Sequence, residues 1–272
     1  MLQRRKARVL FGVVLASALS TLLNACSSDL VLAHWACKPP SSTGHPDSGS
    51  SDGGASFEFP WSTGFEDGFC GFQQGGLCYT TGAASYKIVD SPVHSGHYAA
   101  AFTVIAESDK GTNSRCFRVG ALPREAYYGA WYYVPTLATN SDNWNLYHFQ
   151  GPLPDGGGTE GWDLSLVNND NGGLRLSVRG YLSNLIVPDM SGAPAIPIGS
   201  WFHVVMYLKL AADATGEVDV YQNNDRILYA PNLITDTDNS IFDQWYVGNL
   251  ADSLNPAEST VYVDDVTIEP TL

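Results

Sequence analysis

Apolar and polar residues alternate most regularly between residues 198 and 229. In 201–210 one face of an extended chain would carry only apolar side chains, and the opposite face would carry Trp201, His203, Tyr207 and Lys209. A period of two residues is typical of a strand buried on one side. The pattern repeats at 217–222, and Asn223-Asn224-Asp225 supplies a turn before Ile227. We therefore predict β-hairpins here, with one face in the core.

The same alternation recurs in short segments along the rest of the chain. Gly, Pro, Asn and Asp separate these segments, and no stretch keeps helical periodicity beyond a turn or two. The six residues 168–173 contain an Asn-Gly pair and predict another hairpin. The expected strands are 85–89, 99–105, 114–119, 126–134, 146–150, 162–167, 174–181, 201–210, 217–222, 226–229, 244–247 and 260–268. Many short strands predict an all-β fold, a two-sheet antiparallel jelly-roll β-sandwich over residues 57–272.

Residues 1–25 differ from the rest of the chain and predict an export signal. Four basic residues lie within 4–8, an apolar run covers 9–23, and small residues precede Cys26. The segment 23–26 resembles the lipobox of bacterial lipoproteins, although Asn24 departs from that pattern. The resemblance implies that Cys26 is lipidated and anchors the protein to a membrane, on the periplasmic or cell-surface side. Cleavage by an ordinary signal peptidase near 18–20 or at Ala25 is the alternative.

Residues 26–56 form the expected link between this signal and the domain. From 38 to 56 the composition is almost entirely Pro, Ser, Gly, Thr and Asp. Such a segment buries too little apolar surface to offset the entropy of ordering it. We therefore expect a flexible tether.

The charge of the chain restricts its partners. Loss of four of the 14 basic residues with the signal changes the formal charge from -14 to -18. Binding to a phosphate backbone requires a basic surface, so we expect no nucleic-acid partner. An anionic polysaccharide would also be repelled unless basic residues converge locally.

The five cysteines indicate the redox compartment in which the protein folds. If Cys26 is lipidated, Cys37, Cys70, Cys78 and Cys116 remain, an even number with three alternative pairings. Disulfides are expected in an exported protein, whereas the spacing does not match a zinc site.

Four passages together resemble the concanavalin A-like jelly roll, as in LamG-type domains, carbohydrate-binding modules and polysaccharide lyases. They are Gly-Phe-Glu-Asp-Gly at 64–68, the segment 91–102, the hairpin at 201–221 and Val-Tyr-Val-Asp-Asp-Val-Thr-Ile at 261–268. The resemblance implies the fold but not the activity, because this architecture hosts binders, hydrolases and lyases.

The resemblance also implies a structural calcium ion between the first and last strands. Carboxylates are suitable ligands for Ca²⁺, and the corresponding residues are Glu66, Asp67, Asp264 and Asp265. The alternative is that these acids mark turns. No other cofactor is expected.

Glycosidase chemistry is disfavoured. Glu217-Val-Asp-Val-Tyr-Gln222 resembles the acidic signature of retaining β-glucanases, but Gln222 replaces the last acid. Retaining hydrolysis needs two carboxyl groups.

A lyase is the second hypothesis. Lyases of this fold use His, Gln and Tyr with an Arg that neutralises the uronate carboxylate. Here these would be His148 as base, with Gln150, and Tyr221 as acid. The carboxylate would meet Arg118, Arg175 or Arg179. Convergence of His148, Tyr221 and Arg175 would support this hypothesis.

Glycan binding without catalysis is the first hypothesis, because aromatic rings stack on sugars. Besides the three arginines, the candidate ligand-binding residues are Trp144, Tyr147, Trp162, Tyr181 and Trp201, whereas Trp131 and Trp245 are expected in the core. A non-catalytic structural or protein-interaction lipoprotein is the third hypothesis. A monomer is expected.

Overall fold

The computed structural model describes residue 37 and residues 59–73, 76–108, 110–120, 122–141, 143–152, 158–181, 189–236 and 244–272. These residues belong to one compact unit, residues 35–272. The predicted signal and nearly all of the predicted tether lie outside the described residues. No helix in the described part of the chain is long and apolar enough to cross a membrane.

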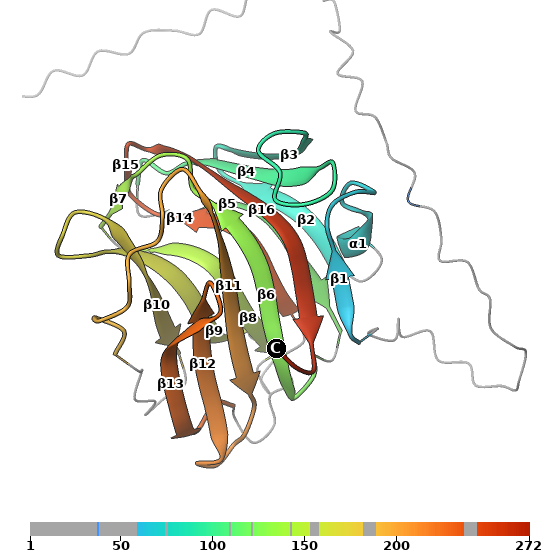
Figure 1. The fold of residues 1–272 in the computed structure, drawn as a ribbon, viewed down its shortest axis with the longest axis vertical. Coiled ribbons are helices and arrows are strands. Elements are labelled where there is room, and N and C mark those ends of the chain that lie inside the picture. The colour runs from blue at the N-terminus through green and yellow to red at the C-terminus, as the bar shows by residue number, and fades with distance from the viewer. Residues whose placement is uncertain are drawn as a thin grey trace, which may run out of the picture. The chain divides into compact units, whose positions relative to one another are not determined.

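Two antiparallel sheets form a β-sandwich (Figure 1). The larger sheet has eight strands, in the order β13-β12-β11-β6-β16-β4-β3 with β1 also paired to β16. Its strands are β1 (Trp61–Thr63), β3 (Ala84–Val89), β4 (Ala99–Ile105), β6 (Glu125–Tyr133), β11 (Trp201–Lys209), β12 (Gly216–Gln222), β13 (Asp225–Leu233) and β16 (Glu258–Glu269). The all-β jelly-roll prediction is confirmed.

The second sheet has six strands, in the order β10-β9-β8-β14-β5-β2. Its strands are β2 (Gly76–Thr81), β5 (Thr112–Val119), β8 (Trp144–Pro152), β9 (Gly158–Asn168), β10 (Leu174–Gly180) and β14 (Gln244–Ala251). Two short strands, β7 (Thr139–Asn140) and β15 (Leu254–Asn255), pair with each other, and one short helix, α1 (Cys70–Gln73), precedes β2.

Each of the twelve predicted strands corresponds to a strand of the structure, with ends shifted by a few residues. The sequence did not indicate β1, β2, β7 or β15. Three of these have two or three residues, too few to show alternation. The fourth, β2, is an edge strand on which Leu77 is exposed, so its alternation is weak.

The predicted hairpins have the expected faces. Strand β11 pairs antiparallel with both β12 and β6. Its even-numbered residues from Phe202 to Leu208 are almost fully buried between the sheets. Asn223 and Asn224 both have positive φ, as a two-residue hairpin turn requires. The loop at 169–173 likewise joins the paired strands β9 and β10.

Large aromatic residues fill the space between the sheets. The largest fully buried side chains are Trp144, Trp162, Trp245, Tyr128, Tyr132, Tyr147, Phe65, Phe72, Phe102, Phe149 and Phe202. Trp245 is in the core as predicted. Trp131 is only half-buried, because it points away from the core on β6, so its assignment to the core was wrong.

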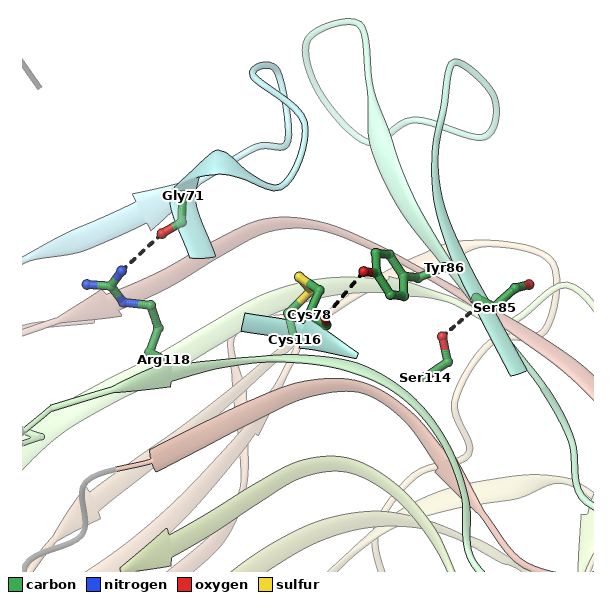
Figure 2. Close-up of a disulfide and its surroundings, with 7 residues drawn as sticks. All are labelled: Gly71, Cys78, Ser85, Tyr86, Ser114, Cys116 and Arg118. Atoms are coloured by element: carbon green, nitrogen blue, oxygen red, sulfur yellow. Dashed lines mark hydrogen bonds between the residues drawn. A yellow bond between two sulfur atoms is a disulfide. The ribbon is translucent and has the colours of Figure 1, made fainter. Parts of the chain in front are cut away.

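Two disulfides, Cys37–Cys70 and Cys78–Cys116, connect the four cysteines. Cys78 and Cys116 lie directly opposite each other on β2 and β5 (Figure 2). Two hydrogen bonds join the sheets nearby: Tyr86 donates to the Cys78 carbonyl at 3.2 Å, and Ser114 donates to the Ser85 carbonyl at 2.6 Å. Disulfides are typical of proteins exported to oxidising compartments.

Candidate active site

A polar cleft of about 390 Å³ lies on the side of the six-stranded sheet that faces away from the core. Its walls are polar, unlike the apolar space between the sheets. The lining residues are Arg115, Asn143, Asn145, His148, Gln150, Asp163, Tyr181 and Leu250. They come from β5, β8, β9 and β14 and from the segments that adjoin β8 and β10.

Strand register brings His148 and Asp163 together. His148 on β8 lies opposite Asp163 on β9, while their neighbours Tyr147 and Leu164 point into the core. The register of β8 shifts between Asn145 and Tyr147. Such an irregularity re-aims side chains, and here it lets Asn145 share the cleft with His148 although they are three residues apart.

Asp163 is the centre of the hydrogen-bond network. Its side chain is 1% exposed. One carboxylate oxygen, Oδ1, lies 2.6 Å from His148 Nδ1, and the other accepts hydrogen bonds from Asn145 Nδ2 at 2.7 Å and Tyr181 Oη at 2.5 Å. Asn145 in turn accepts from Ser165 Oγ at 2.8 Å. A buried carboxylate needs such donors to offset its lost hydration.

Because the Asp163 carboxylate accepts a hydrogen bond from His148 Nδ1, the neutral His148 ring carries its proton on Nδ1. The Nε2 lone pair is then available to accept a proton. This arrangement of a carboxylate behind an imidazole fixes both the tautomer and the orientation of the ring. His148 is 9% exposed, and it lines the cleft.

Tyr181 keeps its proton. Burial is the largest cause that raises the pKa of its phenol, and the adjacent Asp163 charge and the hydrogen bond to Asp163 raise it further. Arg179 opposes this shift by its charge and a hydrogen bond. The residue is therefore a neutral O–H group over the ordinary pH range.

Arg115 supplies a fixed positive charge to the opposite wall. Its Nε donates to Tyr79 Oη at 2.9 Å, and its guanidinium lies 4.3 Å from the centre of the Tyr246 ring. Tyr246 in turn lies 5.3 Å from the His148 ring, measured between centroids. These contacts hold Arg115 in place while it lines the cleft.

Two further arginines lie on the same side of this sheet. On β10, Arg175 and Arg179 pair with Val167 and Asp163 of β9, and both point away from the core. Arg179 is exposed, whereas Arg175 is tied by its Nη1 to the Met190 carbonyl at 3.0 Å. The face therefore gathers three of the arginines of an otherwise acidic protein.

Several predicted ligand-binding residues cannot contact a ligand. Trp144, Tyr147 and Trp162 are fully buried in the core. Their polar atoms are satisfied inside the protein, for instance by the hydrogen bond from Tyr147 Oη to the Val204 carbonyl at 2.9 Å. For these three, the assignment to a binding surface was wrong because the alternation of β8 and β9 points them inward.

Three other predicted residues lie away from the cleft. Arg118 is buried beneath α1, where it donates to the Gly71 carbonyl at 3.0 Å (Figure 2). Tyr221 and Trp201 belong to the eight-stranded sheet. The predicted convergence of His148, Tyr221 and Arg175 was therefore wrong, because Tyr221 lies on the other sheet and Arg175 is not among the residues that line the cleft. Tyr181 lines the cleft with His148.

Five cleft residues were not anticipated from the sequence: Arg115, Asn143, Asn145, Asp163 and Leu250. Arg115 directly precedes Cys116 on β5. Because a disulfide cysteine is expected to point inward, alternation places Arg115 on the outer face and Arg118 on the inner face. In the same way, Trp162 points into the core, so its neighbour Asp163 on β9 points to the outer face. The irregularity in β8 that places Asn145 has no visible sequence signal.

The acids assigned to calcium hold a loop instead. Asp264 Oδ2 accepts from the backbone of His94 at 3.0 Å and of Ser95 at 3.1 Å, and Glu66 Oε1 accepts from His97 N at 2.8 Å. In Asp264 and Glu66, N–H groups therefore already bond to oxygens that a cation would need. Within the described ranges no three His, Cys, Asp or Glu side chains form a metal-binding group. Asp264 and Glu66 are thus less available to Ca²⁺ in this arrangement, and the calcium site as a whole stays a prediction.

Comparison with known proteins supports the fold. No family model and no curated protein matches the sequence. Among solved structures, an endo-β-1,4-glucuronan lyase from the fungus Trichoderma reesei has a TM-score of 0.55 at 16% identity and covers 72% of this chain and 90% of its own.

Two other structures give similar values. The cellulose-induced protein Cip1 has a TM-score of 0.54 at 15% identity, covering 77% of this chain and 97% of its own. The alginate lyase Aly36B has a TM-score of 0.51 at 14% identity, covering 77% and 92%. At these identities the likeness shows the jelly-roll fold alone.

Proposed function

We propose that the protein is a polysaccharide lyase that cleaves a uronate-containing glycan by β-elimination. In this reaction a base removes the proton α to the uronate carboxylate. The electron pair forms a C4–C5 double bond, and the C4–O glycosidic bond breaks with protonation of the leaving oxygen. No water is consumed.

His148 supplies the base. Its Nδ1 is held by Asp163 at 2.6 Å, so Nε2 can accept the substrate proton. The imidazolium that forms is stabilised by the buried carboxylate behind it. This His148–Asp163 pair in a polar cleft is the single observation that carries the proposal.

Arg115 neutralises the substrate carboxylate, with Arg179 near the other end of the cleft. Neutralisation of this charge is needed because proton removal builds negative charge on the carboxylate. The amides of Asn143 and Gln150 line the same cleft and can hydrogen-bond to the developing enolate. Tyr181 donates its only proton to Asp163, so the leaving oxygen is protonated by the His148 imidazolium, which carries the proton taken from the substrate.

Two of the structural neighbours act on uronates by name, as glucuronan lyase and alginate lyase. This agrees with the proposal and suggests polyglucuronate and alginate as the first substrates to try. Arg115 in the cleft, with Arg175 and Arg179 on the same side of the sheet, supplies local positive charge in an acidic protein, which would reduce the repulsion of an anionic glycan.

The test follows the unsaturated product by its ultraviolet absorbance. We expect His148→Ala to lower kcat by a factor of about 10²–10⁴, the usual contribution of general base catalysis. Tyr229→Ala is the matched control, because Tyr229 is 56% exposed on the other sheet. Equal turnover by His148→Ala and the wild type would refute the assignment.

Glycan binding without catalysis is the second candidate. Tyr79, Phe117 and Tyr246 contact one another beside the cleft, with centroids 4.9–6.3 Å apart. Such rings can stack on sugars. Retention on a uronate column that persists in His148→Ala, with no product formed by the wild type, would favour this candidate over the lyase.

Anchoring through Cys26 is part of the same proposal. Cys37 is fixed to Cys70, so ten residues, 27–36, would separate the lipid from the sandwich. They reach at most about 35 Å when extended. Cys26→Ala should release the protein from membranes into the soluble fraction, while retention of the variant on membranes would contradict lipidation.

A further inference from the structure

The eight-stranded sheet carries a second group of aromatic and acidic side chains on the side away from the core. Strands β6, β11 and β12 place Tyr127, Tyr207 and Tyr221 there. Glu125, Glu217 and Asp219 lie on the same strands and the same side. We call these six residues the tyrosine–acid surface. None of them lines the cleft at His148, which belongs to the other sheet.

The rings and carboxylates of this surface contact one another. The Tyr127 and Tyr207 ring centroids are 4.7 Å apart, and those of Tyr127 and Tyr221 are 6.4 Å apart. Tyr207 Oη donates to Glu125 Oε1 at 2.7 Å, and Tyr221 Oη donates to Asp219 Oδ2 at 3.3 Å. The result is a set of aromatic rings bordered by acceptor oxygens.

Negative charge exceeds positive charge on this surface. Arg226 reaches Asp219 Oδ2 at 3.4 Å, and Lys209 lies in register between Glu125 and Glu217. Two cations thus face three carboxylates. Asp219 is 2% exposed.

The raised pKa values of Glu217 and Tyr127 agree with an excess of negative charge on this surface. Burial is the first cause that raises the pKa of Glu217, and the Asp219 charge adds to it. Burial also raises the pKa of the Tyr127 phenol, followed by the charges of Asp219, Glu217 and Glu125. A cation placed among these groups would relieve both effects.

Aromatic residues continue along the same strands beyond Gly129. Trp131 stacks between His94 and His203, with centroid distances of 3.7 and 5.0 Å, and Trp201 lies beside Tyr133 at 5.6 Å. Tyr127 and Trp131 are four residues apart on β6, which corresponds to about 13 Å. This length matches two to three sugar residues of an extended chain.

We propose that this side of the eight-stranded sheet binds a second glycan, a chain of protonated amino sugars. The rings would stack on the apolar faces of the sugars. The carboxylates would attract the ammonium groups, which also interact favourably with aromatic faces. The two sides of the sandwich then differ in charge: the arginine-lined cleft selects uronates, and the acidic aromatic side selects amino sugars.

The experiment measures binding by calorimetry of three probes: a glucosamine hexamer at mildly acidic pH, its N-acetylated counterpart and a hexamer of uronate. We expect the glucosamine hexamer to bind and its affinity to fall as salt is raised. Tyr127→Ala and Glu217→Gln should each weaken it about five-fold to ten-fold. His148→Ala, in the cleft of the other sheet, should not.

Several results would overturn the inference. Equal affinity for the N-acetylated hexamer would show that charge plays no part, and a hexalysine peptide that binds as tightly would indicate a basic protein partner instead. Loss of binding in His148→Ala would assign the glucosamine chain to the cleft. Absence of lyase activity, in contrast, would leave this inference intact, because binding of the glucosamine hexamer does not depend on turnover.

Discussion

Asp163→Asn tests the proposed mechanism at a residue that acts through His148. The carboxylate accepts from three donors, His148 Nδ1, Asn145 Nδ2 and Tyr181 Oη, and is almost fully buried. An asparagine offers one acceptor oxygen and one NH₂ donor in the same volume. Either orientation therefore sets a donor against a donor.

The less costly orientation points the new oxygen at Asn145 and Tyr181 and the NH₂ group at His148. His148 Nδ1 must then become an acceptor, so the ring proton moves to Nε2. The lone pair that accepts the substrate proton is lost from the cleft. We expect kcat to fall by a factor of about 10²–10⁴, as for removal of a general base, with a change in KM of less than about three-fold.

Stability should fall as well, because charge-assisted hydrogen bonds contribute about 1.5–3 kcal/mol each. Urea unfolding should show a loss of about 2–4 kcal/mol with the variant still folded. The control is Asp189→Asn, the same chemical change at an exposed residue that hydrogen-bonds to Ser191 in its own turn. Turnover of Asp163→Asn within about three-fold of the wild type would refute the proposed role of Asp163. Nitrogen NMR that shows the proton still on His148 Nδ1 would also refute it.

Three further predictions concern stability. Replacement of Cys78 and Cys116 by Ala should lower the free energy of unfolding by about 3–4 kcal/mol, as expected for a bridge that closes a 38-residue separation, and a loss below about 1 kcal/mol in urea unfolding would contradict this. Burial raises the pKa of Asp264 to about 6, above its unfolded value, so the wild type should lose stability relative to Asp264→Asn as the pH rises from about 4 to 6; unfolding curves whose difference is independent of pH would exclude this linkage. Because N–H groups occupy the acidic side chains at Glu66 and Asp264, calorimetry should give the same Tm with millimolar Ca²⁺ or with EDTA, and a rise of several degrees with Ca²⁺ would restore the calcium site.

The strands were predictable because each carries a local alternation of apolar and polar residues. The faces of β11 followed directly from that alternation, and so did the hairpin at Asn223. The cleft was less predictable, since it depends on which strands become neighbours. His148 and Asp163 lie 15 residues apart in sequence, and only the pairing of β8 with β9 makes them adjacent.

Aromatic residues were wrongly placed from the sequence both on the surface and in the core. Trp144 and Trp162 suited a sugar-binding surface by residue type, but the core of a jelly roll needs large side chains and takes them. Trp131 was expected in the core and lies outside, stacked between two histidines. Residue type alone does not distinguish the two sides of a strand when both carry aromatic side chains.

The most direct test of the central claim is mass spectrometry of the products formed from polyglucuronate and alginate in heavy-oxygen water. β-Elimination predicts unsaturated oligosaccharides whose masses sum to that of the substrate, with no heavy oxygen incorporated, and loss of these products in His148→Ala. Products that gain one heavy oxygen per cleaved bond would show hydrolysis and contradict cleavage by β-elimination. Folded protein that binds these glycans but forms no product from any uronate polymer would do so as well.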